Sequence, residues 1–259
     1  MSSRSSPAPL FVRESGPVES PAALLLHGQV LDGEVWAEVA GPLAHTRRVL
    51  VPDLPGYGRS PAIAPFSLEA VAAAVEASME ARGIRDLDVI GFSLGTYHAL
   101  ALALGGRLRV RRLYLLGPFA GGDVTVRERF AGFAAMVRAG AVDPAEAFVA
   151  MSLGAEWAAV HPQTTARVLA RARTAPRATI VAELEAAASC TDLRPSLAHV
   201  RAPTLVRVGT ADVHTPPAWA EEIAAAIPGA RLERADGVGH LYAVQEPAAL
   251  VASVTAFVA

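Results

Sequence analysis

The chain has 259 residues and a formal net charge of −2, and 52% of its residues are hydrophobic while 19% are charged. This composition is typical of a compact globular protein, and the near-neutral charge gives no reason to expect a nucleic acid or an anionic membrane as a partner. All 23 basic residues are arginine, which excludes Schiff-base chemistry on a lysine, and the single Cys190 excludes an internal disulfide and a multi-cysteine metal site.

The N-terminal residues predict no secretion signal. The segment 1–7 is polar, no apolar core of the secretory type follows it, and no apolar run in the chain approaches the length of a membrane span. We therefore expect a cytoplasmic protein with no membrane partner, present as a monomer or a homodimer.

Short apolar runs, typical of buried strands, alternate with helical segments along the chain. In chain order the predicted strands are 10–14, 22–26, 48–53, 87–90, 112–117, 203–209 and 230–234. The predicted helices between and after them are 34–43, 67–82, 96–104, 217–227 and 247–258. This alternation predicts an α/β fold with a mainly parallel, doubly wound sheet covered by helices on both faces.

The alternation stops between residues 121 and 194, where the sequence predicts helices only. These predicted helices are 124–142, 144–151, 164–172 and 178–189. The segment is longer than an ordinary connection between elements. We interpret 121–194 as a helical insertion and 1–120 together with 195–259 as the core.

The segment from Gly91 to Gly95 has the pattern G-x-S-x-G and lies between the predicted strand 87–90 and the predicted helix 96–104. Such a tight turn leaves no room for bulky side chains two positions before and after Ser93, and glycine satisfies this requirement. The turn would raise the serine hydroxyl above the sheet at a helix N-terminus, where unpaired N–H groups favour negative charge. The pattern alone also fits a strand-to-helix turn with an incidental serine.

Two more polar residues follow predicted strands later in the chain. Asp212 comes after the strand 203–209, and His240 lies in the loop after the strand 230–234. Because sites form at the carboxyl ends of parallel strands, we expect Ser93, Asp212 and His240 to meet there. A serine hydroxyl needs an imidazole to accept its proton, and the imidazole needs a carboxylate that holds its tautomer.

At this point the sequence resembles the α/β-hydrolase family over nearly the whole chain outside the insertion. The stretches that carry the resemblance are His27-Gly28 with Trp36, Asp53 to Ser60, Gly91 to Gly95, Pro203 to Asp212, and Gly239-His240. One departure is the short N-terminal region, which implies that the family's first two strands are abbreviated or that one is missing.

The resemblance implies a role for each candidate residue. Ser93 would be the nucleophile, His240 the general base and acid, and Asp212 its orienting partner. The backbone N–H groups of Leu94 and Gln29 would form the oxyanion hole. The insertion 121–194 falls where family members carry a helical cap over the site, and the chemistry requires no metal and no organic cofactor.

Other polar and aromatic residues have more ordinary interpretations. We expect His27 to support the oxyanion loop and His98 to pack inside its helix. His214, close to Asp212 in sequence, either lines the rim of the site or has an ordinary structural part, and the second interpretation is favoured. Asp53 and Ser60 are expected to hold their own loop by side-chain hydrogen bonds. In the insertion, Phe130, Phe148 and Trp157 either shape a pocket or form core, and the arginines either recognise a carboxylate or form a solvated face.

The predicted function is hydrolysis of a small-molecule carboxylic ester or lactone through an acyl-enzyme on Ser93. Family branches that open epoxides or displace halide use aspartate at this position, so those reactions are disfavoured. Carbon–carbon bond hydrolases and cofactor-free perhydrolases share the same triad and stay open as alternatives. So does a member of the fold that binds a small ligand without turnover.

Overall fold

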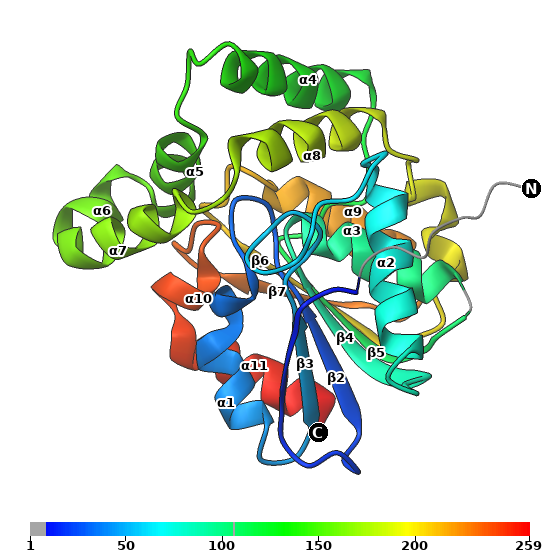
Figure 1. Ribbon diagram of the computed structural model, residues 1–259. Coiled ribbons are helices and arrows are strands. Elements are labelled where there is room, and N and C mark those ends of the chain that lie inside the picture. Colours follow the sequence, from blue (N-terminus) through cyan, green and yellow to red (C-terminus); the bar gives the residue numbers. More distant parts are fainter. Residues whose placement is uncertain (1–8, 106) are drawn as a thin grey trace, which may run out of the picture.

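The computed structural model describes residues 9–105 and 107–259, and its seven strands form one sheet (Figure 1). In chain order the strands are β1 (Val12–Ser15), β2 (Ala22–Leu26), β3 (Arg48–Pro52), β4 (Asp86–Phe92), β5 (Arg109–Leu116), β6 (Thr204–Gly209) and β7 (Arg231–Ala235). Their order in the sheet is β1-β3-β2-β4-β5-β6-β7. Strand β1 is antiparallel to β3 and every other neighbouring pair is parallel, so the predicted fold class is confirmed.

Helices cover both faces of this sheet. Helices α1 and α11 pack against each other on one face, and α2 and α3 pack together on the other (Figure 1). The elements outside the insertion are η1 (Gly33–Trp36), α1 (Ala37–Leu43), α2 (Leu68–Glu80), α3 (Leu94–Gly105), η2 (Arg194–His199), α9 (Pro217–Ala226), α10 (Tyr242–Gln245) and α11 (Pro247–Val258). This two-sided cover is the doubly wound arrangement that the alternation of elements predicts.

The middle of the sheet is mainly apolar where the helices enclose it, and Asp88 of β4 is a buried exception. All five residues of β2 are buried, and β4 is buried from Leu87 to Phe92. A strand enclosed on both faces needs apolar side chains at nearly every position, which explains the continuous apolar runs in the sequence. The carboxyl ends of β2, β4, β5 and β6 lie along one edge, where open α/β sheets form their sites.

Two predicted boundaries are wrong for identifiable reasons. Strand β5 begins at Arg109 rather than Arg112, because Arg111 and Arg112 flank the buried Asp88 of β4 at 2.9 and 3.6 Å and give the strand a polar start. The first helix of the insertion ends at Arg138, before a Gly140 whose φ of +74° is left-handed.

Residues 121–194 hold helices and no strand, and these helices lie over the carboxyl end of the sheet (Figure 1). They are α4 (Val124–Arg138), α5 (Pro144–Leu153), α6 (Ala155–Val160), α7 (Pro162–Ala172) and α8 (Arg177–Ser189). Helices α4 and α8 pack side by side, while α5, α6 and α7 form a second group. At the N-terminus, one short strand, β1, precedes β2 in the described residues. The segment 1–7, on which the prediction of no secretion signal depends, lies outside the described residues.

Within the described part of the chain, no helix combines the length and the apolar character needed to cross a membrane.

Candidate active site

Ser93 lies at a strained turn between β4 and α3. Its φ is +55°, a left-handed value that is costly for a residue with a side chain. A Cβ on Gly91 would lie 2.7 Å from the carbonyl oxygen of Gly95, and a Cβ on Gly95 would lie 2.5 Å from that of Leu26. The two glycines of the pattern are therefore required by close backbone contacts on both sides of Ser93.

The structure brings Ser93, His240 and Asp212 together in one hydrogen-bonded chain. His240 Nε2 lies 2.9 Å from Ser93 Oγ, and His240 Nδ1 lies 2.7 Å from Asp212 Oδ2. All three side chains are buried, although they come from the ends of three different strands, β4, β6 and β7. With the ring proton on Nδ1 donated to the carboxylate, Nε2 is free to accept the serine proton.

Asp212 accepts hydrogen bonds on both carboxylate oxygens. Oδ1 accepts from the backbone N–H groups of His214 and Thr215 at 2.9 and 3.0 Å, and Oδ2 accepts from the hydroxyls of Tyr242 and Thr215 at 2.8 and 3.0 Å. Burial by itself would raise the pKa of Asp212, but the neighbouring His240 and these donors outweigh it and lower the pKa to about 2. The carboxylate is thus charged throughout the neutral range and holds the imidazole in place.

The loop after β2 lies directly against Ser93. A Cβ on Gly28 would stand 2.7 Å from Ser93 Cβ, so only glycine lets the backbone come this close. In the described part of the chain, neither the N–H of Gln29 nor that of Leu94 donates to another backbone group. Both are therefore available as donors to an oxygen that becomes negatively charged next to Ser93.

His27 and Asp53 hold the surrounding loops. His27 Nδ1 donates to the carbonyl of Gly28 at 2.8 Å, and its Nε2 accepts the N–H of Leu54 at 2.8 Å. Asp53 accepts the N–H groups of Gly33 and Arg59, and Ser60 donates to the carbonyl of Asp53. None of these side chains lines the cavity at Ser93.

A cavity opens from Ser93 toward the insertion. Its first part, about 50 Å³, is bordered by Ser93, Leu94, His240 and Gln29. A second part of about 200 Å³ shares several wall residues with the first and is mainly apolar. Its lining residues are Gln29, Val30, Arg129, Phe130, Phe133, Phe148, Met151, Leu184 and His214. Phe130 and Phe148 thus line a pocket, whereas Trp157 does not and instead stacks on His161 with ring centroids 4.1 Å apart.

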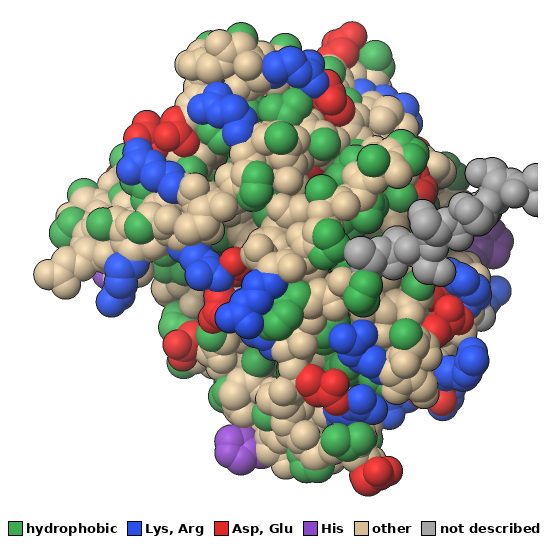
Figure 2. Space-filling view, in the orientation of Figure 1, with side chains coloured by type: hydrophobic (Ala, Val, Ile, Leu, Met, Phe, Trp, Pro, Cys, Tyr) green, Lys and Arg blue, Asp and Glu red, His purple; other side chains and the backbone are tan. Residues whose placement is uncertain are grey.

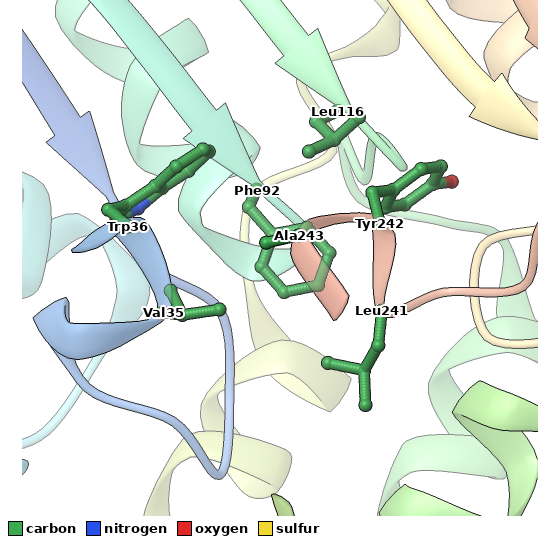
Figure 3. Close-up of a pocket in the computed structure, with 7 residues that line it drawn as sticks. All are labelled: Val35, Trp36, Phe92, Leu116, Leu241, Tyr242 and Ala243. Carbon is green, nitrogen blue, oxygen red and sulfur yellow. The ribbon is translucent and has the colours of Figure 1, made fainter. Parts of the chain in front are cut away.

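A separate apolar cavity lies around Phe92, the residue before Ser93 (Figure 3). Its walls are Val35, Trp36, Leu116, Leu241, Tyr242 and Ala243, and Tyr242 turns its hydroxyl away from it (Figure 3). At about 10 Å³ it holds at most one water-sized group. We therefore interpret it as a packing gap.

Most arginines of the insertion form a solvated face. Figure 2 shows arginine and acidic side chains interspersed over the visible surface, and Arg138 and Arg173 pair with Glu185 and Glu146. Arg129 differs, because it borders both parts of the cavity and donates to the carbonyl of His214 at 3.0 Å. Among the described residues, no cluster of three or more His, Cys, Asp or Glu side chains is arranged to hold a metal ion.

Sequence reasoning missed Tyr242 and underrated His214. The ring of His214 lies 4.8 Å from that of His240 and lines the cavity, and its Nε2 is 3.0 Å from the buried Ser152 Oγ. Burial and the nearby His240 lower the pKa of His214 to about 3, so the His214 ring is neutral at pH 7. Proximity in sequence to Asp212 and to His240 was the available signal for His214 and for Tyr242.

The chain is similar to known hydrolases in sequence. A family model described as the alpha/beta hydrolase fold matches residues 21–247. A pimeloyl-(acyl-carrier protein) methyl ester esterase of Aromatoleum aromaticum is 35% identical over 241 residues, which cover 88% of this chain and 94% of the esterase. A lipase of Mycobacterium tuberculosis is 34% identical over 153 residues, and this match spans 59% of the chain and 58% of the lipase.

The similarity extends to solved structures. An esterase of Thermogutta terrifontis has a TM-score of 0.85 and 27% identity, with 96% of this chain and 92% of the esterase covered. The enol-lactonase of Burkholderia xenovorans has a TM-score of 0.86 and 26% identity, with 96% of each chain covered.

Proposed function

The chain belongs to the α/β-hydrolase family and is a hydrolase, and from this premise we propose that it cleaves a small-molecule carboxylic ester or lactone through an acyl-enzyme on Ser93. One observation carries the proposal, namely the buried hydrogen-bonded chain from Asp212 through His240 to Ser93 Oγ. In this proposal the insertion 121–194 is a cap over the site, and the protein is cytoplasmic and either monomeric or homodimeric.

The proposed reaction has two steps. His240 accepts the proton of Ser93 as the hydroxyl oxygen attacks the carbonyl carbon, and the oxyanion is bound by the N–H groups of Gln29 and Leu94. His240 then gives the proton to the leaving alcohol, and the acyl group remains on Ser93. A water that loses its proton to His240 releases the acid and restores the serine.

The cavity supports an apolar group next to the scissile carbonyl. Three phenylalanines, Met151 and Leu184 border it, so an alkyl or aryl part of the substrate would be held by contact and desolvation. The relatives named as methyl ester esterase, lipase and enol-lactonase favour an ester or a lactone as the scissile group.

The test is a hydrolysis screen over acyl esters of increasing length, lactones and thioesters. We expect turnover of at least one ester or lactone, and we expect Ser93→Ala to lower kcat by roughly 10⁴-fold or more. Ser189→Ala, which changes an exposed serine of α8, serves as the matched control. Unchanged turnover in Ser93→Ala would overturn the proposal.

The same screen separates the alternatives. Cleavage of a β-diketone at a carbon–carbon bond would indicate a carbon–carbon bond hydrolase, and peracid formation would indicate a perhydrolase. Tight binding of a lactone or ester without any turnover would favour a ligand-binding member of the fold.

A further inference from the structure

A buried carboxyl group lies close to the site but outside the Ser93–His240–Asp212 chain. Glu183 belongs to α8 of the insertion and is only 1% exposed. Its carboxyl group accepts a hydrogen bond from the hydroxyl of Tyr57, which is equally buried. Burial raises the pKa of Glu183 to about 7. An apolar residue at this position would avoid the free-energy cost of burying a carboxyl group, so packing alone does not account for Glu183.

Tyr57 links Glu183 to the loop after β2. Its hydroxyl oxygen lies 3.5 Å from the N–H of Val30, and its ring meets the ring of His27 edge-on, with centroids 5.5 Å apart. Val30 has a φ of +66°, a left-handed value that a β-branched residue adopts only when its surroundings impose it. The contact with Tyr57 thus supports a strained residue directly after Gln29.

Gln29 also lies beside Glu183. Its side chain adjoins the Glu183 carboxyl group, and its amide nitrogen has no hydrogen-bond partner in the described part of the chain. Leu184, the next residue of α8, lines the apolar cavity. Glu183 therefore lies where the insertion, the substrate cavity and the loop carrying the Gln29 N–H meet.

Helix α8 has a second hydrogen bond to the loop after β3, which does not involve Glu183. Thr179, one turn earlier, donates to the carbonyl of Gly56 at 3.1 Å and ties α8 to the same loop as Tyr57. What distinguishes Glu183 is that its partner Tyr57 also contacts the N–H of Val30, the residue after Gln29.

We propose that Glu183 is a positioning residue for the oxyanion hole: by holding the Tyr57 hydroxyl against the N–H of Val30, it fixes the backbone of residues 28–30 against Ser93. The inference rests on the proposed function. It makes the insertion a contributor to kcat as well as to substrate choice.

The test compares kcat and KM of Glu183→Ala, Glu183→Gln and Thr179→Val with those of the unchanged protein, on the best ester from the screen. We expect Glu183→Ala to lower kcat about 20-fold with little change in KM, less than the roughly 10²–10³ lost when a whole oxyanion donor is removed. Glu183→Gln keeps an oxygen that accepts from Tyr57, so it should restore kcat to within about threefold. Thr179→Val removes the other tether and should leave kcat within about twofold.

A second readout reports on the oxyanion hole itself. A boronic acid analogue of the acyl group forms a tetrahedral adduct with the serine, and its inhibition constant should rise in Glu183→Ala by the same factor as kcat/KM falls. Rates are taken well below the unfolding temperature of each variant, so loss of folded protein does not enter.

Glu183→Ala with unchanged kcat, or an equal fall of kcat in Thr179→Val, would overturn the inference while the proposed function stands. Absence of ester and lactone turnover in the unchanged protein would overturn both.

Discussion

The edge of the sheet and the inserted helices differ in how far their residues are buried and hydrogen-bonded. At the sheet edge, β4 is buried from Leu87 onward, and the Asp212 carboxylate has a donor on every side. In the insertion, α6 has no buried residue and α7 has only Ala172. Ser93, His240 and Asp212 are therefore held by the core, whereas much of the wall of the apolar cavity comes from helices α4, α5 and α8 of the insertion.

This contrast separates the residues that we expect to carry out the reaction from those that we expect to select the substrate. Substitutions at the strand ends should change the rate for every substrate, and substitutions on α4 and α5 should change which substrate is preferred. Helix α8 is the exception, because Glu183 contacts Tyr57 of the loop after β3, which in our proposal supports the oxyanion hole.

The largest expected effect lies at the sheet edge. Asp212→Asn keeps the size of the side chain but removes the charge that holds the His240 tautomer. We expect kcat to fall by roughly 10⁴-fold for all substrates alike. Steady-state kinetics on two esters of different length checks this, with Asp236→Asn, an exposed aspartate of the β7–α10 loop, as control. A fall in kcat confined to one ester would contradict the expectation that Asp212 acts on all substrates alike.

The next effect concerns the junction between the two regions. The pKa of Glu183 is raised from an ordinary value of 4.5 to about 7, so the folded protein holds a proton that the unfolded chain releases in this range. The free energy of unfolding should therefore fall as pH rises from 4.5 to 7, by up to about 3 kcal/mol from this group.

Chemical denaturation at several pH values measures this fall. Glu183→Gln cannot titrate, so its stability should not show the same decline, and the difference between the two proteins cancels the contributions of other groups. Parallel stability curves would contradict an ionisable Glu183 in a buried setting.

The smallest expected effect belongs to the insertion. Phe133→Ala enlarges the apolar part of the cavity without touching the part at Ser93. The ratio of kcat/KM for an octanoyl ester to that for an acetyl ester should rise about tenfold, while the acetyl ester reacts at the usual rate. Val160→Ala, on an exposed position of α6, is the control. A uniform loss for both esters would mean that Phe133 supports the reacting groups instead.

The sequence predicted the residues at the sheet edge better than those of the insertion, because the signals for the sheet-edge residues lie within short stretches of the chain. An apolar run and two glycines around Ser93 describe a turn within nine residues, and Asp212 and His240 each follow a recognisable strand. The Glu183–Tyr57 contact joins residues 126 positions apart on a helix and a loop, and no periodicity reports it. The polar start of β5 was missed in the same way, because its arginines are explained by Asp88 on a neighbouring strand.

The most direct test of the central claim is reaction of the intact protein with a fluorophosphonate, followed by mass spectrometry of the protein and its peptides. We expect one adduct per chain, on the peptide that contains Ser93, and none in Ser93→Ala. An adduct on another residue, or an unlabelled Ser93 in the folded protein, would contradict a nucleophilic serine at the turn between β4 and α3.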